Sequence, residues 1–215
     1  MTNNIFPTSG KSDSVLEALA LACVRGDKKL FSDLNFRVSP GVCLHIRGEN
    51  GVGKTSLLRL LTGLSKPDAG EVFWGNHSIA KDPIAYHRDL LFIGHRDALK
   101  EDLTALENIQ LYAAVDDVAL SQEKALGALW RFGLRGREYL PVHFLSAGQK
   151  RRVLMARMLT REARLWILDE PFNALDIKAV HELQDLIVQQ IDRGGSVIMT
   201  SHQEVSIPNM QVLDL

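Results

Sequence analysis

The chain has 215 residues, of which 46% are hydrophobic and 24% are charged, values typical of a globular domain and unlike those of disordered, collagen-like or coiled-coil chains. Its 25 basic and 26 acidic side chains give a formal net charge of −1, so we expect no nucleic acid partner. No uncharged stretch approaches the roughly 20 apolar residues of a membrane-spanning helix, so the sequence predicts no crossing of a bilayer.

The N-terminal segment MTNNIFPTSGKSDS is polar and lacks the apolar core of a signal peptide. We expect residues 1–14 to form a flexible tail and the protein to stay in the cytosol. No repeat or low-complexity linker divides the remainder, so residues 15–215 are predicted to form a single domain. Cys23 and Cys43 lie in apolar surroundings without the paired spacing of a zinc site and are expected to be buried thiols.

The first part of the chain is predicted to be rich in β-strands. Alternating apolar residues, separated by turn-forming dipeptides, indicate strands at Leu19–Val24, Leu34–Val38 and Val42–Ile46. From Lys54 to Leu64 the leucines recur at helical spacing, which predicts a helix that follows a glycine loop. Two further strands, which we expect to pair with each other, are predicted at Glu71–Trp74 and Leu90–Ile93.

The middle of the chain has helical periodicity and predicts a helical subdomain over roughly residues 96–160. Its helices are predicted at Thr104–Val115, Ser121–Phe132 and Ser146–Thr160. Short apolar runs typical of a buried parallel sheet follow, with an amphipathic helix between them, at Leu165–Leu168, Ile177–Ile191 and Ser196–Thr200. Met210–Leu215 is predicted as one more strand. The expected fold class is α/β, with an antiparallel β-rich edge and a helical subdomain.

A glycine-rich segment between the third strand and the first helix fits the phosphate-loop pattern G-x-x-x-x-G-K-[ST]. Glycines let the backbone turn closely around a polyphosphate, and the amide groups at the helix N-terminus supply partial positive charge. Lys54 adds a full charge near the β- and γ-phosphates, the Thr55 hydroxyl can ligate Mg²⁺, and Ser56 can reach an α-phosphate. The predicted nucleotide-binding residues of this loop are Gly48, Glu49, Asn50, Gly51, Val52, Gly53, Lys54, Thr55 and Ser56.

A second polar motif follows the apolar strand Leu165–Leu168, which ends in Asp169 and Glu170. The carboxyl ends of strands in an α/β sheet are where ligands bind. Asp169 is expected to hold Mg²⁺ through water, and Glu170, whose side chain points differently, is suited to polarise a water that attacks a γ-phosphate. A solvated acidic turn is the alternative, but the upstream phosphate loop favours the functional interpretation.

Between these two motifs, LSAGQ at residues 145–149 opens a predicted helix. Here the chain resembles the ATP-binding cassette (ABC) family, whose signature is LSGGQ, and the resemblance covers almost the whole chain. NALD at residues 173–176 is similar to the family's D-loop, and TSH at residues 200–202 is similar to its switch histidine after a strand.

The resemblance implies the P-loop NTPase fold of an ABC cassette and an ATPase that works with ATP and Mg²⁺. Glu170 and His202 would be catalytic, and Thr55 and Asp169 would hold the metal. The signature would complete the site of the opposite subunit, so that two chains sandwich two ATP molecules in a homodimer. The residues acting there are Ser146, Gly148 and Gln149, with Asp176 as the D-loop aspartate.

Three residues depart from the family pattern. Ala147 replaces a glycine, but its methyl group falls between the two phosphate-contacting positions and we expect it to be tolerated. Arg25 stands where the family has an aromatic residue that stacks on adenine, and a guanidinium plane can also stack on a purine. His95 replaces the Q-loop glutamine, either to order a metal-bound water or as a structural loop residue.

Two charged segments each leave two interpretations open. The cluster Lys150-Arg151-Arg152 is expected to be a solvated helix face, with contact to an acidic partner as the alternative. In the ABC family, the segment that corresponds to His95–Glu107 lines a groove that receives a coupling helix of the membrane subunit. Its apolar residues would either make that contact or pack the subdomain core, and these are Ala98, Leu99, Leu103 and Leu106.

Within the family, His95, LTALEN at residues 103–108 and FLSAGQKRR at residues 144–152 together resemble the ATPase subunits of the ABC complexes of cytochrome c biogenesis, which handle haem. This implies a peripheral subunit on the cytoplasmic face of the inner membrane, bound to CcmB-like and CcmC-like integral membrane subunits. No direct haem binding is expected, because the spacing of the histidines does not indicate a pair of haem-iron ligands. These histidines are His45, His77, His87, His143 and His181. The alternatives are the ATPase subunit of another ABC transporter, a soluble ABC ATPase acting on ribosomes or DNA, and a nucleotide-binding regulator without turnover.

Overall fold

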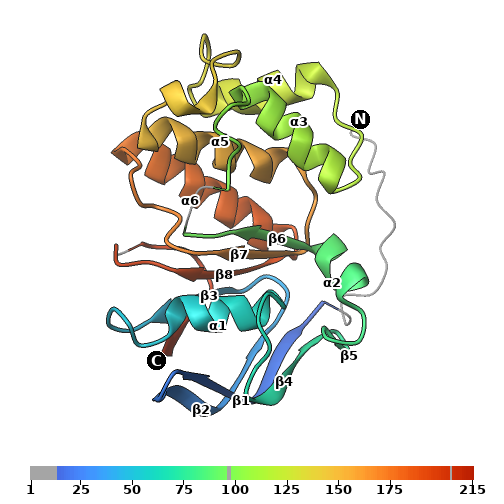
Figure 1. Ribbon diagram of the computed structural model, residues 1–215, viewed down its shortest axis with the longest axis vertical. Coiled ribbons are helices and arrows are strands. Elements are labelled where there is room, and N and C mark those ends of the chain that lie inside the picture. Colours follow the sequence, from blue (N-terminus) through green and yellow to red (C-terminus); the bar gives the residue numbers. More distant parts are fainter. Residues whose placement is uncertain (1–13, 96–97, 204) are drawn as a thin grey trace.

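The computed structural model describes residues 14–95, 98–203 and 205–215 (Figure 1). The predicted N-terminal tail, except for Ser14, therefore lies outside the described residues. The described chain forms two β-sheets with helices between and above them (Figure 1), and its fold class is α/β as predicted.

The first sheet is antiparallel, with the strand order β2-β1-β4-β5. Its strands are β1 (Leu16–Arg25), β2 (Lys28–Val38), β4 (Ala69–Trp74) and β5 (His77–Ser78). The hairpin between β1 and β2 turns at Gly26, whose φ of +57° suits a residue without a side chain. This sheet is the predicted β-rich edge, and its first two strands are longer than the sequence pattern indicates.

The second sheet is parallel, with the order β6-β7-β8-β3-β9. Its strands are β3 (Cys43–Arg47), β6 (Leu90–Ile93), β7 (Leu165–Leu168), β8 (Ser196–Thr200) and β9 (Met210–Asp214). Successive side chains of β7 point to opposite faces of the parallel sheet. Leu165 and Ile167 belong to the apolar core on one face, and Trp166 and Leu168 belong to the core on the other. Because both faces of the sheet are covered, the sequences of these strands are continuously apolar and do not alternate between apolar and polar residues.

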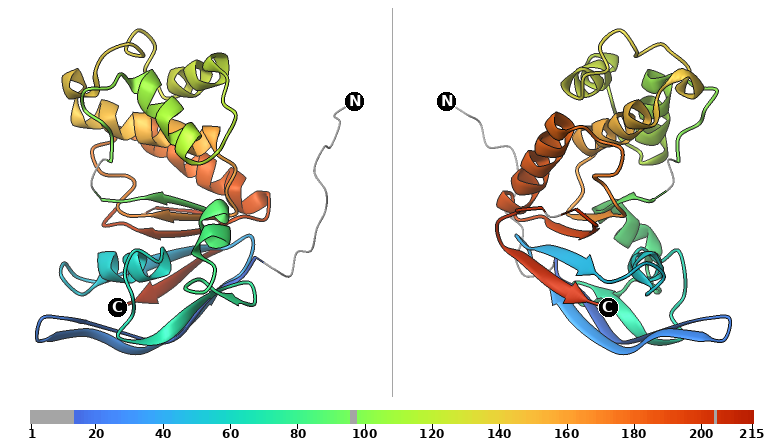
Figure 2. Two further views of the ribbon diagram at one scale, coloured as in Figure 1. Left: turned by 45° about the vertical axis from the view of Figure 1, so that its right-hand side comes forward. Right: turned by 90° about the vertical axis from the view of Figure 1, so that its left-hand side faces the viewer.

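Helices cover the parallel sheet on both faces (Figures 1 and 2). Helix α1 (Lys54–Leu61) lies between the two sheets and buries four leucines there. It ends before the predicted Leu64, because Gly63 adopts a left-handed φ of +73° directly after the C-cap. The opposite face carries α6 (Ile177–Asp192) and beyond it the three helices of the helical region, α3 (Ala105–Val115), α4 (Gln122–Arg131) and α5 (Ala147–Thr160).

The two predicted strands near residues 70 and 90 are present but do not pair. Strand β4 pairs with β1 and β5, whereas β6 joins the parallel sheet beside β7. The short helix α2 (Pro83–Asp89), absent from our prediction, separates them and buries Tyr86. A four-residue apolar run shows that a strand is buried but not which sheet receives it, and this is why the prediction was wrong.

The segment that follows His95 packs largely inward. Leu99 is 8% exposed and Leu106 5%, and both belong to the core shared with α3, α4 and α5. Core packing is thus the correct interpretation for these two leucines, while residues 96 and 97 lie outside the described part. Both cysteines are buried free thiols, as predicted, and burial raises the pKa of Cys43 to about 12. Across the described ranges, no helix combines the length and the apolar character needed to cross a membrane.

Candidate functional site

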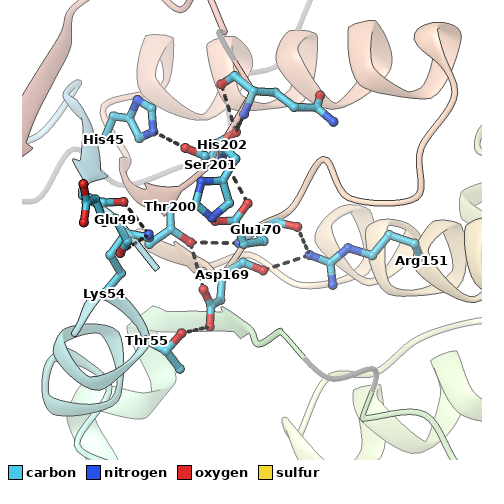
Figure 3. Close-up of polar contacts among 12 residues, drawn as sticks. His45, Glu49, Lys54, Thr55, Arg151, Asp169, Glu170, Thr200, Ser201 and His202 are labelled. Carbon is cyan, nitrogen blue, oxygen red and sulfur yellow. Dashed lines mark hydrogen bonds and ion pairs between the residues drawn. The ribbon is translucent and has the colours of Figure 1, made fainter. Parts of the chain in front are cut away.

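A cleft of about 460 Å³ opens at the carboxyl ends of the parallel strands, beside the N-terminus of α1. Its volume lies within the range of small-molecule sites. Side chains from the predicted phosphate loop, from the end of β7 and from the loop after β8 gather there (Figure 3). The lining residues are Leu30, Asn50, Gly51, Gly53, Lys54, Thr55, Ser56, His95, Asp169, Glu170, Asn173 and His202.

The phosphate loop depends on its glycines. Gly48 has a φ of +144°, and a Cβ there would lie 2.8 Å from Val52 Cγ1 and 2.9 Å from the Leu215 carbonyl oxygen, so no larger residue fits. The loop then delivers Lys54, whose ammonium donates to the Gly48 carbonyl at 2.7 Å and to the Glu49 carbonyl at 3.1 Å. An ammonium has three N–H donors, so one is left for an anion at the mouth of the loop.

Asp169 lies at the floor of the cleft and is 2% exposed. The Thr200 hydroxyl donates to its Oδ1 at 2.8 Å, and the Thr55 hydroxyl donates to its Oδ2 at 3.0 Å (Figure 3). The lone pairs of the Thr55 oxygen stay available, because the hydroxyl uses its hydrogen toward the carboxylate. A hydroxyl and a carboxylate side by side are the hard oxygen ligands that Mg²⁺ prefers, so these residues fit that metal.

Glu170 is held in an uncommon conformation, with a φ of +50°. Its backbone N–H donates to the Thr200 hydroxyl at 2.9 Å, and its Oε2 accepts from the His202 backbone N–H at 3.3 Å. Its Oε1 is buried, accepts no hydrogen bond from the described residues, and lies 3.4 Å from His202 Nε2. A buried carboxylate oxygen with spare acceptor capacity beside a cleft fits a group that takes a proton from water.

Arg151 is a residue that our sequence analysis placed wrongly. It is 5% exposed rather than on a solvated face, and its guanidinium donates to four backbone carbonyls: Gly94 at 3.2 Å, Asp169 at 3.1 Å, Glu170 at 2.9 Å and Pro171 at 3.3 Å. Helix α5 thereby holds the backbone that carries both acidic residues (Figure 3). The neighbouring Lys150 is half-buried and pairs with the exposed Glu101 at 2.8 Å.

The signature residues form the start of α5 and do not line the cleft of their own chain. Ser146 caps the helix by accepting from the Gln149 N–H at 3.3 Å, while Gln149 Oε1 accepts from the Ser146 N–H at 2.9 Å. Ala147 is exposed. A Cβ on Gly148, in contrast, would lie 2.8 Å from the Ala174 carbonyl oxygen, so glycine is required one position after the alanine.

The D-loop aspartate is held against the same helix. Asp176 caps α6 by accepting from the Ala179 N–H at 2.9 Å, and it pairs with Arg152 at 2.5 Å. The Ala179 N–H and the Arg152 guanidinium lower the pKa of Asp176. The D-loop and the signature helix of one chain thus form a single connected surface.

Arg25, Gly48, Glu49 and Val52 were predicted to contribute to nucleotide binding but are not among the cleft-lining residues. The Arg25 guanidinium donates to the carbonyl of its neighbour Val24 instead. Leu30 and Asn173 line the cleft and were missed. Asn173 could have been found from its place in the D-loop motif, whereas nothing in the local sequence marks Leu30, which reaches the loop only because β2 folds over Gly53.

Comparison with known proteins agrees with this geometry. The family model for ABC transporters matches residues 31–173. The chain belongs to the ABC transporter family. The resemblance identified from the motifs is confirmed, and as an ABC cassette the chain is an ATPase of a family that works with ATP and Mg²⁺.

Among curated relatives of this ABC cassette are proteins named cytochrome c biogenesis ATP-binding export protein CcmA. The one from Nitrosomonas europaea is 45% identical, over 95% of this chain and 97% of the relative. The one from Dechloromonas aromatica is 48% identical, over 94% and 98% respectively. The one from Escherichia coli strain K12 is 46% identical, over 92% and 94%.

Solved ABC cassettes have the same fold. An ATP-binding subunit of an ABC transporter superimposes with a TM-score of 0.78 at 28% identity, over 88% of this chain and 80% of that chain. The cassette MJ0796, solved as a dimer in a post-hydrolysis state with ADP and phosphate, gives a TM-score of 0.78 at 26% identity, over 87% and 88%.

Proposed function

We propose that residues 15–215 form one cassette that serves as the ATP-hydrolysing subunit of an ABC complex, coupling ATP binding and hydrolysis to haem export or release for c-type cytochrome biogenesis. The observation that carries the ATPase assignment is the convergence of Lys54, Thr55, Asp169, Glu170 and His202 on one cleft. The assignment to haem handling is supported by relatives of 45–48% identity that bear the CcmA name and align over nearly their full length.

Each side chain of the cleft has a distinct task in this proposal. Lys54 contacts the β- and γ-phosphates with its remaining N–H, and the glycine loop supplies amide groups around them. Thr55 and Asp169 would hold Mg²⁺, which neutralises phosphate charge when it is bound. Glu170 accepts the proton of the attacking water at Oε1, and His202 lies beside it to contact the γ-phosphate.

The site needs a second copy of the chain in this proposal. Ser146, Gly148 and Gln149 lie outside the cleft of their own chain, at the start of a capped helix whose exposed end suits an anion. Two chains arranged head to tail would bring each signature helix to the partner's ATP, with Asp176 at the boundary. The ATPase rate per chain should then rise with protein concentration, and a constant rate over a range in which the chain is monomeric would contradict the dimer.

We also propose that the chain works as a peripheral subunit on the cytoplasmic face of the inner membrane, bound to CcmB-like and CcmC-like membrane subunits. Support comes from the relatives, whose printed name describes an export protein. Purification of the chain from native membranes should bring down integral membrane subunits of this kind. Recovery of the chain without any membrane subunit would contradict the assignment but not the ATPase activity.

The decisive test of the catalytic assignment is Glu170→Gln. Because the phosphate contacts are retained and only the proton acceptor is lost, ATP affinity should stay within a few-fold while turnover falls by about 10²-fold or more. His202→Ala should also lower turnover. His87→Ala removes a histidine bonded to the Thr62 carbonyl, away from the cleft, and serves as the control that should leave turnover unchanged. Parental turnover in Glu170→Gln would show that Glu170 is not the base.

A further inference from the structure

We propose that His45 is a positioning residue for the ATPase reaction: it fixes the peptide group between Ser201 and His202 and, through that peptide, the carboxylate of Glu170. The inference rests on the proposed role of Glu170. His45 is the third residue of β3 and does not line the cleft, so it cannot touch the nucleotide itself. It is 3% exposed, which is unusual for an imidazole on a central strand whose neighbours are apolar.

The hydrogen bonds of His45 determine its protonation. Its Nε2 lies 3.1 Å from the Ser201 carbonyl oxygen, which can only accept, so Nε2 carries a hydrogen. Its Nδ1 lies 3.3 Å from Arg47 Nε, which can only donate, so Nδ1 carries none. The imidazole is therefore neutral, in the Nε2–H form, and both of its nitrogens are used. Burial lowers its pKa, which agrees with this assignment.

The acceptor of His45 belongs to the same peptide group that holds Glu170. The Ser201 carbonyl and the His202 N–H are the two ends of one planar trans peptide and point in opposite directions. On one side the carbonyl accepts from His45, and on the other the N–H donates to Glu170 Oε2 at 3.3 Å (Figure 3). A rotation of this peptide would break both hydrogen bonds, so a donor at position 45 restrains the orientation of the Glu170 carboxylate.

The rest of the loop gives this peptide limited support. The Ser201 hydroxyl accepts from the Gln203 N–H at 3.0 Å and donates to the Gln203 carbonyl at 3.0 Å, which closes the turn but leaves the Ser201 carbonyl to His45. An apolar side chain on β3 would pack the strand equally well. A buried imidazole with a partner on each nitrogen is explained by what it holds rather than by packing.

The test compares His45→Leu with His45→Gln. Leucine has no donor and should lower kcat about three- to tenfold, with the KM for ATP changing less than twofold, because the phosphate contacts are not involved. The glutamine amide can donate to the Ser201 carbonyl and should restore most of the parental kcat. His87→Leu removes an equivalent imidazole contact to a backbone carbonyl, 2.9 Å from Thr62 O, and should leave kcat unchanged.

A double-mutant cycle distinguishes positioning from a merely structural role. In the Glu170→Gln background, His45→Leu should cause no further loss of turnover, since the carboxylate that it orients is absent. If His45→Leu does not fold, His45→Asn takes its place, as its side chain is too short to reach the carbonyl and should lower kcat where glutamine does not.

The proposal is overturned if the donor-free variant keeps the parental kcat, if glutamine and the donor-free variant lose kcat equally, or if the loss persists in full in the Glu170→Gln background. Failure of the proposed function gives a different result, because Glu170→Gln itself would then hydrolyse ATP at the parental rate.

Discussion

Replacing Arg151 with methionine tests how strongly the helical region supports the backbone of Asp169 and Glu170. The guanidinium donates to the carbonyls of Gly94, Asp169, Glu170 and Pro171, at 2.9 to 3.3 Å, from a side chain that is 5% exposed. Methionine preserves helix propensity and much of the apolar stem, so the change removes the guanidinium and its polar contacts while most of the packing is kept.

The expected cost follows from the number of bonds. At about 1 kcal/mol for each hydrogen bond, four contacts give about 4 kcal/mol. Removing the charge also relieves the cost of burying a guanidinium, which reduces the expected loss to about 2–4 kcal/mol. For a chain of this size each kcal/mol lowers Tm by about 2–4 °C, so Tm should fall by about 10 °C.

Thermal and urea unfolding measure this loss directly. Lys150→Met, one residue earlier on the same helix, removes an ion pair with Glu101, whose side chain is 66% exposed, and should change the unfolding free energy little. Arg151→Lys keeps the charge but has fewer donors and should fall between the parent and Arg151→Met. Equal unfolding free energies for Arg151→Met and Lys150→Met would refute the assigned role of Arg151.

Three further predictions concern the loop, the signature helix and acid stability. Lys54→Ala should weaken ATP binding at least tenfold in a fluorescent-nucleotide titration, with an unchanged circular dichroism spectrum, because the ammonium proposed to contact the phosphates is lost. Gly148→Ala should cost about 1–3 kcal/mol in urea unfolding, since its Cβ would meet the Ala174 carbonyl, whereas Ala147→Gly should leave turnover within twofold. Because the pKa of His45 is lowered from 6.5, the unfolded chain binds more protons there, so the unfolding free energy should decline as the pH falls below about 6.5. This part of the decline should be absent from His45→Gln in unfolding experiments at several pH values. The charged groups acting on His45 are Arg47, Glu170 and Asp214.

The phosphate loop and the acidic pair could be predicted from sequence because their chemistry is local. Glycine spacing dictates the turn before Lys54, and an apolar run that ends in two carboxylates places Asp169 and Glu170 at a sheet edge. The helices of the helical region were predicted correctly because their apolar spacing extends over three turns or more.

The parts that could not be predicted depend on contacts between distant segments. Nothing in the sequence of residues 90–93 indicates that β6 pairs with β7. The paired residues of these two strands lie 75 positions apart in the chain. In the sequence, Arg151 is one of three adjacent basic residues, and nothing distinguishes it from its neighbours. Only the folded chain shows that its guanidinium contacts the carbonyls of Asp169 and Glu170, which follow β7. Likewise, the partner of His45 is 156 residues away in sequence.

The contacts made by Arg151 and by the loop that His45 holds meet at one strained residue, Glu170. A φ of +50° costs a residue with a side chain about 1–2 kcal/mol, so the conformation persists only where its surroundings impose it. Thr200 holds its amide, the His202 peptide holds its carboxylate, and Arg151 holds its carbonyl. These three groups come from β8, from the loop that follows it and from α5. Because α5 begins at the signature residues, Arg151 joins the signature helix directly to the backbone of the proposed base within the same chain.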